Sequence, residues 1–424
     1  MARNKKANHR NLLVGFAKRD LTPPLPFPLA GMATKQERLA ERVRDPLYAR
    51  AMAFGNGRRT VLVIAGDLLM ITAPLREAVE RRLAERQVQY AGLMLSATHS
   101  HSSTGGYWDA PSARLFMGAY RPEIFTRLAE GIAAAAEAAV DDLRPASLDY
   151  GETQTSYLNY NRRFKEGAID RTLGVLTVRR EDDTLRVLTF GAHPVVVGFR
   201  DYHAASADYP GELLKTFAGE DGLFLVGPVG GVNVLYPEGP LDGDVHLHLL
   251  ARLLREEADK AIAVAQPVHG DAVAFAAGEM TVRIVAPPLL PDRLRWLDAA
   301  LYPVRLYVRH FGRGGLRDGM PARVPVVRVG DLVFTGFPAD LGASVGLAAR
   351  VKIAARGLRP AAVASHTDDY VGYVHLPEDY QQFASADKGE MWMNIYENAM
   401  GFGGRHVGIE LLDAFEGALA EVCR

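Results

Sequence analysis

The sequence predicts an α/β protein with a mixed β-sheet and helices on both faces, built as a single domain over residues 1–424. Short apolar runs of strand length alternate along the chain with longer stretches of helical character. Several of these apolar runs pass without a break into polar residues. The sequence shows no internal repeat, low-complexity segment or long Ser/Gly linker that would mark a domain boundary.

The first half of the chain supplies most of the predicted sheet. A strand is expected at Thr60 to Met70, with Asp67 near its end, followed by a helix at Pro74 to Gln87 and a strand at Ala91 to Leu95. An alanine-rich segment, Pro122 to Leu143, predicts a long helix because alanine has the highest helix propensity. Further strands are expected at Leu148 to Tyr150, Leu173 to Val178, Leu185 to Phe190 and Gly222 to Val226.

The second half continues the alternation with more irregular loops. A strand pair joined at Gly330 predicts a hairpin, and Pro325 would place its first strand at a sheet edge, since proline cannot donate a backbone hydrogen bond. Helices are predicted at Val245 to Val264, at Pro291 to His310 with a break or bend at Pro303, and at Ser344 to Ala355; the strands are Val324 to Val329, Asp331 to Thr335 and Ala361 to Ser365.

Composition narrows the class of protein. The chain carries 49 basic and 50 acidic side chains, so its net charge of -1 gives no electrostatic basis for binding nucleic acid or an anionic membrane. Cys423 is the single cysteine, which excludes an intrachain disulfide and a multi-cysteine metal site. We find neither a signal-peptide core nor an apolar stretch of about 18 residues, so we expect a cytoplasmic protein without an integral membrane segment.

Polar, chemically active side chains follow four of the predicted strands. The strand ends deliver His99 with His101, then His193, Asp340 and the segment Asp368 to Tyr370. Two imidazoles, a carboxylate and an open position are a common arrangement for catalytic zinc, and ligands bind outside the carboxyl ends of strands in α/β sheets. Structural roles are the alternative: exposed loop histidines, a histidine that ends a strand, a helix N-cap at Asp340 and a half-buried tyrosine.

Short motifs follow one another in a fixed order along nearly the whole chain. They are R-D-L-T-P-P (19–24), L-A-G-M (29–32), D-P-L-Y-A-R (45–50), S-A-T-H-S-H-S (96–102), N-R-R (161–163), A-H-P (192–194) and S-A-D-Y-P-G (206–211).

In this order, the motifs resemble the N-terminal catalytic domain of neutral/alkaline non-lysosomal ceramidases, as a short relative without the family's C-terminal domain. The resemblance implies one Zn²⁺ per chain, held in that family by two histidines, a glutamate and a tyrosine. The matching positions here are His99, His193, Asp340 and Tyr370.

Two departures from the family pattern bear on the expected substrate. Asp340 stands in a P-A-D segment where the family has P-G-E, so the carboxylate is one methylene shorter. The segment Gly230 to Asn233 replaces the G-D-x-S of the ceramidases proper. The resemblance therefore implies hydrolysis of the amide of a small or lipid-like N-acyl substrate, and a substrate smaller or more polar than ceramide.

Roles for the remaining polar residues follow from this reading. We expect His101 to assist proton transfer or to hold the oxyanion, with Tyr380 as a second donor to it. Arg162 and Asn233 are expected to bind substrate; for Arg162, pairing with a nearby acid is the alternative. Asp67 and Asp208, and His203 beside Asp208, are expected to orient the ligand imidazoles. A homo-oligomer is possible. The competing hypothesis is a binding or scaffold protein that kept the fold and lost the metal.

Overall fold

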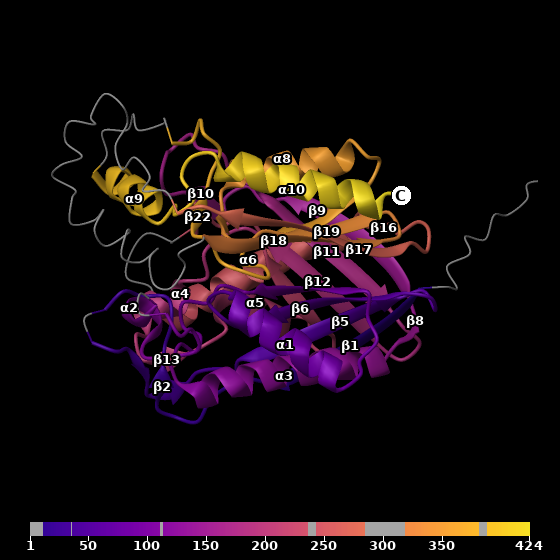
Figure 1. The fold of residues 1–424 in the computed structure, drawn as a ribbon, viewed down its shortest axis with the longest axis horizontal. Coiled ribbons are helices and arrows are strands. Elements are labelled where there is room, and N and C mark those ends of the chain that lie inside the picture. The colour runs from indigo at the N-terminus through magenta and orange to yellow at the C-terminus, as the bar shows by residue number, and fades with distance from the viewer. Residues whose placement is uncertain (1–11, 35, 111–112, 236–242, 285–318, 381–387) are drawn as a thin grey trace, which may run out of the picture.

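Three β-sheets form the body of the protein (Figure 1). The structure is a computed structural model, and it describes residues 12–424 apart from 35, 111–112, 236–242, 285–318 and 381–387. The first sheet has the strand order β7-β6-β5-β1-β8. In this sheet β6 pairs antiparallel with β5, and β5 pairs antiparallel with β1, whereas β6 and β7 run parallel. The members are β1 (Leu13–Asp20), β5 (Tyr48–Gly55), β6 (Thr60–Gly66), β7 (Gly92–Ala97) and β8 (Arg144–Pro145).

The other two sheets also combine antiparallel strands with one parallel pair each. The second has the order β14-β12-β11-β9-β16, and its parallel pair is β12 with β14. The third has the order β17-β18-β19-β21, and its parallel pair is β19 with β21. The members are β9 (Ser147–Gln154), β11 (Thr172–Arg179), β12 (Thr184–Phe190), β14 (Asp221–Val226) and β16 (Gln266–Pro267), then β17 (Val273–Val282), β18 (Met320–Val329), β19 (Leu332–Gly336) and β21 (Arg359–Ala364).

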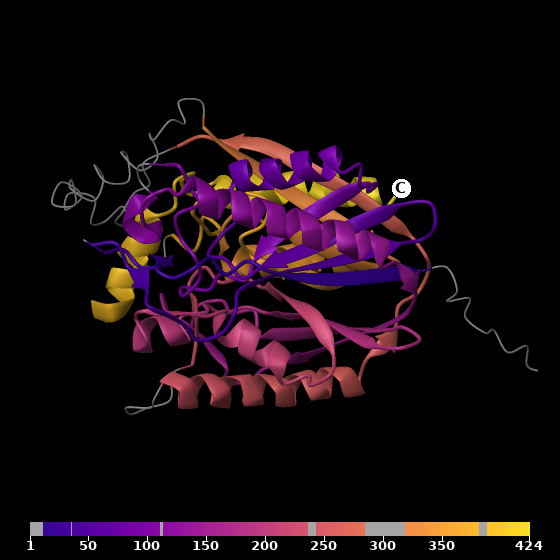
Figure 2. The same cartoon turned by 90° about the horizontal axis from the view of Figure 1, so that it is seen from below.

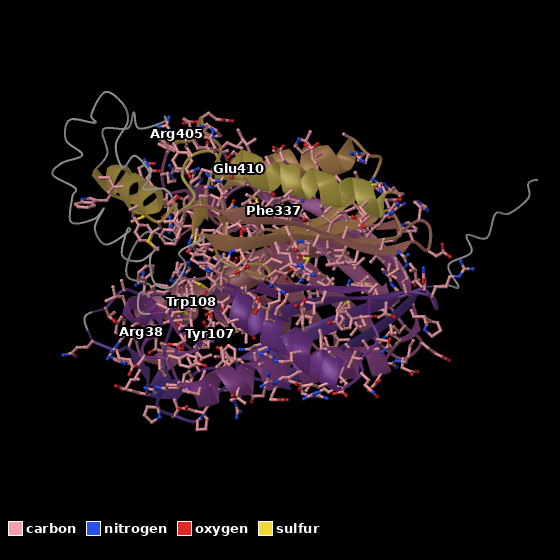
Figure 3. The ribbon with its side chains drawn as sticks, in the orientation of Figure 1. Arg38, Tyr107, Trp108, Phe337, Arg405 and Glu410 are labelled. Atoms are coloured by element: carbon pink, nitrogen blue, oxygen red, sulfur yellow. The ribbon has the colours of Figure 1, made fainter. Side chains whose placement is uncertain are left out.

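Helices cover the outer face of each sheet. In Figure 2, helices α1 and α3 lie on one side of the molecule and α6 on the opposite side. Helices α8 and α10 cover the third sheet (Figure 1), where Phe337, labelled in Figure 3, packs against Phe415 of α10 with 5.8 Å between ring centroids. The covering helices are α1 (Ala73–Glu85), α3 (Pro122–Asp141), α5 (Asp208–Lys215), α6 (Gly243–Ala263), α8 (Ala343–Ala354) and α10 (Val407–Val422).

The alternation of side chains along each strand divides the interior into separate cores. Val61 and Val63 of β6 point into a core that all three sheets share, whereas Leu62 and Ile64 face the helices. In the shared core the rings of Phe54 and Phe334 stack, 5.8 Å apart, and join the first sheet to the third. Strands buried on both faces read as continuous apolar runs, which explains the pattern in the sequence.

Shorter elements connect the sheets near the ends of their strands. Among them, β20 pairs in parallel with β22 and β10 pairs with β15. These elements are β2 (Phe27–Pro28), β3 (Leu39–Ala40), β4 (Arg42–Val43), β10 (Asn159–Asn161), β13 (Ala204–Ala205), β15 (Val232–Val234), β20 (Asp340–Leu341), β22 (Tyr373–Val374), α2 (Arg114–Met117), α4 (Val196–Arg200) and α9 (Lys388–Ala399).

The α/β class with mixed sheets and helices on both faces is confirmed, but the strands form several sheets where the sequence predicted one. Pro325 does not lie in an edge strand, because β18 is flanked by β17 and β19. Its missing N–H is tolerated because β18 pairs with β19 only from Val326 onward. The helix predicted at Pro291 to His310 lies outside the described residues. Within the described ranges, each helix is too short or too polar to cross a bilayer.

Candidate metal centre

The parallel strand pairs of the three sheets end at one place, and the polar residues that follow these strands meet there. His99 follows β7, His193 follows β12, and Asp340 and His366 follow β19 and β21. The sheets are joined at this point, because Ser365 donates its N–H to the carbonyl of Val226, the last residue of β14. The structure thus brings the predicted residues His99, His193 and Asp340 together at the ends of these strands.

Backbone carbonyls hold the imidazoles of His99 and His193 in one tautomer. Nδ1 of His99 lies 2.7 Å from the carbonyl of Leu69, and Nδ1 of His193 lies 2.8 Å from that of Val232. A carbonyl only accepts, so Nδ1 carries the hydrogen in each neutral ring and Nε2 presents a lone pair. Burial lowers the pKa of both imidazoles, that of His99 well below its ordinary value, which keeps the rings neutral near pH 7.

Asp340 places one carboxylate oxygen among three imidazole nitrogens. Its Oδ1 lies 3.4 Å from Nε2 of His99, 3.5 Å from Nε2 of His193 and 3.3 Å from Nε2 of His366. Oδ2 accepts a hydrogen bond of 2.8 Å from the Tyr370 hydroxyl. Burial alone would raise the pKa of Asp340, but the facing imidazoles, His366 first, lower it well below the usual range through their positive charge, so the group is a carboxylate; neutral imidazoles do not supply this compensation.

The backbone around Asp340 is fixed by a close contact with the segment after β14. Gly230 forms a bridge with Gly342, and a Cβ atom at Gly230 would lie 2.6 Å from the carbonyl oxygen of Asp340. Glycine is therefore required there. Asp340 does not cap a helix: α8 begins after Gly342, which makes no side-chain cap. The structural alternative for Asp340 is thus contradicted.

The Asp340 oxygen that faces the imidazoles lacks a donor. Within the described part of the chain, Oδ1 has no hydrogen-bond partner although it is buried. A buried acceptor without a partner costs about 1–3 kcal/mol, and more when it is charged. A cation placed between Asp340 Oδ1 and the imidazole nitrogens would stabilise this arrangement, because it would attract both the carboxylate charge and the lone pairs that face it.

The spacing of these atoms fits a zinc ion. Bonds from zinc to His nitrogen and carboxylate oxygen are about 2.0–2.2 Å, so neighbouring ligand atoms of a tetrahedral site lie about 3.4 Å apart. The measured separations of 3.4 and 3.5 Å between Asp340 Oδ1 and the His99 and His193 nitrogens agree with this value. The site therefore has the donor types and spacing that zinc requires.

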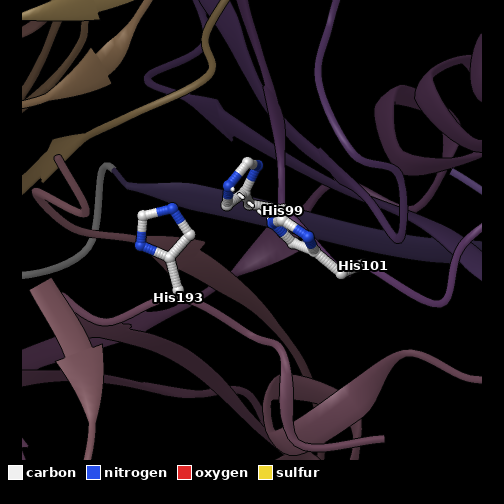
Figure 4. Close-up of side chains that lie close together, drawn as sticks. All are labelled: His99, His101 and His193. Atoms are coloured by element: carbon white, nitrogen blue, oxygen red, sulfur yellow. Dashed lines mark hydrogen bonds between the residues drawn. The ribbon is translucent and has the colours of Figure 1, made fainter. Parts of the chain in front are cut away.

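His101 lies beside the cluster at the edge of a pocket. Its Nε2 is 3.2 Å from Nε2 of His99, and since that nitrogen has no hydrogen, His101 is the donor; Figure 4 shows this contact and His193 facing the pair. Gly31 makes room for it, because a Cβ atom there would lie 2.7 Å from the His101 Cα. Burial, and then the neighbouring imidazole of His193, lower the pKa of His101 well below its ordinary value.

Two tyrosines approach the cluster from the loop after β21. Tyr370, expected as a ligand, directs its hydroxyl to Asp340 Oδ2. Tyr373, which sequence reasoning missed, places its hydroxyl 3.3 Å from Nε2 of His193. Burial, and then Asp340, raise the pKa of both phenols well above its ordinary value, so both are protonated donors in the metal-free protein.

Arg162 and Asn233, both expected to bind substrate, contact each other, and protein groups occupy the guanidinium of Arg162. Arg162 donates to Asn233 Oδ1 at 3.1 Å, to the Tyr373 hydroxyl at 2.9 Å and to Glu397 at 2.8 Å. Burial would raise the pKa of Glu397, but the cation of Arg162 outweighs it and lowers that pKa to about 2. Arg162 therefore positions Tyr373, and Glu397 is a further residue of the site.

The other predicted residues have different partners. Asp67 binds Arg50 at 2.6 Å, and Asp208 accepts the backbone N–H groups of Val197 and Tyr209. His203 is half-exposed and bonds to the carbonyl of Leu39. Backbone carbonyls, as described above, take the place of these carboxylates beside the imidazoles.

Tyr380 lies apart from the cluster as well. Its ring packs against His375, 5.8 Å between centroids, and its buried hydroxyl has no hydrogen-bond partner in the described part of the chain. In the pocket that reaches Asp340, the tyrosines of the lining are Tyr370, Tyr373 and Tyr396.

That pocket, of about 360 Å³, opens onto the cluster. Its floor carries His99, His101 and Asp340, and its walls are mostly apolar. Trp392 stands at the entrance with 61 % of its surface exposed. The other wall residues are Gly31, Ala33, Leu69, Met70, Phe116, Ile395, Ala399 and Met400.

Comparisons with known proteins agree with the fold and with the resemblance seen in the sequence. Residues 12–166 match the family model described as neutral/alkaline non-lysosomal ceramidase, N-terminal. This range includes His99 and His101 and ends before His193 and Asp340.

Two curated relatives carry the name neutral ceramidase. That of Mycobacterium tuberculosis is 24% identical over 252 residues, 49% of this chain and 39% of the relative. That of Pseudomonas aeruginosa is 32% identical over 124 residues, 27% of this chain and 18% of the relative. The chain thus spans well under half of the length of these relatives.

Two solved structures share the fold. The crystal structure of neutral ceramidase from Pseudomonas aeruginosa superposes with a TM-score of 0.72 at 19% identity, covering 95% of this chain and 75% of that one. A structure described as ceramidase complexed with C2 gives a TM-score of 0.73 at 18% identity, covering 95% and 76%.

Proposed function

We propose, from the premise that the chain is a relative of the neutral/alkaline non-lysosomal ceramidases, that it is a zinc-dependent hydrolase. Its reaction is cleavage of the amide bond of a small or lipid-like N-acyl substrate. The observation that carries this proposal is the unpartnered Asp340 oxygen, 3.4 and 3.5 Å from the Nε2 lone pairs of His99 and His193. The same cluster is the reason to prefer an enzyme over a scaffold that has lost its metal.

His99, His193 and Asp340 would hold one zinc ion per chain, with a tyrosine as the fourth protein ligand. Zinc at such a site supplies a nucleophilic water near neutral pH and polarises the carbonyl of an amide. The resemblance assigns the tyrosine as Tyr370. The geometry favours Tyr373, since its hydroxyl lies 3.3 Å from His193 Nε2 and beside the Arg162 cation, which favours a phenolate.

The other residues of the pocket position the substrate and move protons. The apolar walls bind an acyl chain and exclude water, and they leave the amide at the polar floor. His101 is neutral near pH 7 because its pKa is lowered, so it accepts the proton that the attacking water loses and returns it to the leaving amine.

Oxyanion stabilisation requires a hydroxyl donor in the pocket. Tyr370 and Tyr373 line it and keep their protons in the metal-free protein because burial raises their pKa. The phenol that does not bind zinc serves as this donor. Tyr380, expected in this role, has its hydroxyl beside Gly401 instead, where a Cβ atom would lie 3.3 Å from it.

A screen of N-acyl amides of graded acyl length tests this function. Amine release by protein purified without chelator is expected to stop after metal removal and to return when zinc is added back. Protein that holds a full equivalent of zinc and hydrolyses no N-acyl compound would contradict the proposed reaction. Protein that holds no zinc would support the scaffold alternative.

A further inference from the structure

Arg38 is a buried arginine that has no role in the site described above. It directly precedes β3, is labelled in Figure 3 and has 3 % of its surface exposed. Among the residues that the structure describes, its guanidinium donates to carbonyl groups and one hydroxyl, and to no carboxylate. Burial lowers the pKa of Arg38 to about 10, so the side chain remains a cation near pH 7. The fold therefore buries a cation without an opposite charge bonded to it, which is costly.

The guanidinium joins three separate segments of the chain. The two N–H groups of Nη1 donate to the carbonyl of Ala30, 3.2 Å away, and to the carbonyl of His101, 2.9 Å away. Nε donates to the carbonyl of Tyr202 at 2.8 Å, in the loop that follows α4. A guanidinium is planar and directs its N–H groups rigidly, so these bonds fix the three carbonyls relative to one another.

The segments that Arg38 joins also hold His101. Gly31, the residue after Ala30, lies in the pocket wall against the His101 ring, where a Cβ atom would come within 2.7 Å of Cγ. Helix α4 contacts the same residue, and a Cβ atom at Gly198 would lie 3.2 Å from the His101 carbonyl oxygen. Because these contacts are close-packed, a shift of either segment moves the imidazole on the pocket floor.

We propose that Arg38 is a positioning residue for proton transfer, because it fixes the backbone of His101 and of the pocket wall against which the His101 imidazole packs. The inference rests on the proposed function, in which His101 accepts the proton of the attacking water. The described pocket lining does not include Arg38, so it acts through His101 and not on the substrate. Proton transfer requires hydrogen-bond reach, and a misplacement of about 1 Å can cost about 100-fold in rate.

A purely structural role is the alternative, in which Arg38 stabilises the loop before β3 and leaves proton transfer unaffected. Double-mutant kinetics separates the two roles, since mutations that act through one group are not additive. Arg38→Met should lower kcat for an N-acyl amide about 10–100-fold, with KM and zinc content as in the wild type. In a His101→Gln background, Arg38→Met should cause no further loss of kcat, because the group that Arg38 positions is already absent.

A second readout does not depend on turnover. In protein labelled with ¹⁵N-histidine, the NMR signals of the His101 ring are assigned by their absence from His101→Gln. These signals should shift in metal-free Arg38→Met, because the ring is no longer held in one position. Arg38→Lys keeps the charge as a compact ammonium, so it should give a smaller shift and an intermediate kcat. If Arg38→Met does not fold, Arg38→Lys takes its place in both measurements.

Arg186→Met is the matched control, because Arg186 is a buried arginine of β12 whose guanidinium pairs with Glu220. It should lower the melting temperature and leave kcat and the His101 signals as in the wild type.

Three results would overturn this inference and leave the proposed function intact. They are wild-type kcat in Arg38→Met, the same factor of loss with and without His101, and unchanged His101 signals. Wild-type protein that hydrolyses no N-acyl amide would overturn both.

Discussion

Replacing Asp340 by asparagine should stabilise the metal-free protein while it destroys the metal site. Asparagine can keep its oxygen toward the Tyr370 hydroxyl and turn its Nδ2 toward the imidazole lone pairs, where Oδ1 lacks a donor. Removing an unpartnered buried charge gains about 1–3 kcal/mol, and about 1 kcal/mol is lost because the bond from Tyr370 is no longer charge-assisted. The net effect is a rise of up to about 2 kcal/mol in the free energy of unfolding.

The assay is equilibrium denaturation of chelator-stripped protein at pH 8, where the imidazoles, whose pKa values are lowered, are neutral. Zinc binding of Asp340→Asn should fall strongly, since an amide oxygen is a much weaker ligand than a carboxylate. Asp67→Asn is the control, because Asp67 is a buried carboxylate paired with Arg50. Its loss should cost about 3–5 kcal/mol. An Asp340→Asn protein less stable than the wild type and equal to it in zinc binding would refute the reasoning.

Three further predictions concern the surroundings of the cluster. Glu397→Gln should lose about 3 kcal/mol of stability at pH 7. Because the pKa of Glu397 is lowered from 4.5 to about 2, the stability difference between wild type and variant should vanish in denaturation curves as the pH falls from 4.5 to 2. A difference that stays constant over this pH range would contradict the prediction. Tyr373→Phe should weaken zinc binding more than Tyr370→Phe, and the reverse order in chelator competition would restore the ligand that the resemblance assigns. Trp392→Ala should raise KM for long-chain amides about fivefold, if the acyl chain of the substrate covers about 40 Å² of the Trp392 ring, and should leave KM for short-chain amides unchanged. Equal changes for long and short substrates would contradict binding of the acyl chain at the pocket entrance.

The part of the site that the sequence predicted follows from one local rule. An apolar run that passes directly into a histidine or an aspartate places that side chain at a strand end, and parallel strands end at a common edge. This rule located His99, His193 and Asp340 without any knowledge of the sheet order. The same rule applies to His366, which follows the strand at Ala361 to Ser365. The signal for His366 was therefore present in the sequence.

Other features of the fold and of the site depend on contacts that a single sequence does not encode. Continuous apolar runs show that β6 and β19 are strands but not that they belong to different sheets, so one sheet was predicted in place of three main sheets. Asp67 and Asp208 were expected to orient imidazoles because carboxylates commonly do so. Carbonyls of Leu69 and Val232 do it here, and every residue has a carbonyl, so no residue type marks them. Glu397 comes from α9, far along the chain, and meets Arg162 only in the folded protein.

Zinc content per chain, measured by elemental analysis on protein purified without chelator, tests the central claim most directly. We predict about one equivalent in the wild type and far less in His99→Ala and in His193→Ala, both with native circular dichroism, because apolar neighbours rather than the site anchor the strands. Full zinc occupancy in both variants, or far less than one equivalent in the wild type, would contradict the assignment of this cluster as a zinc centre.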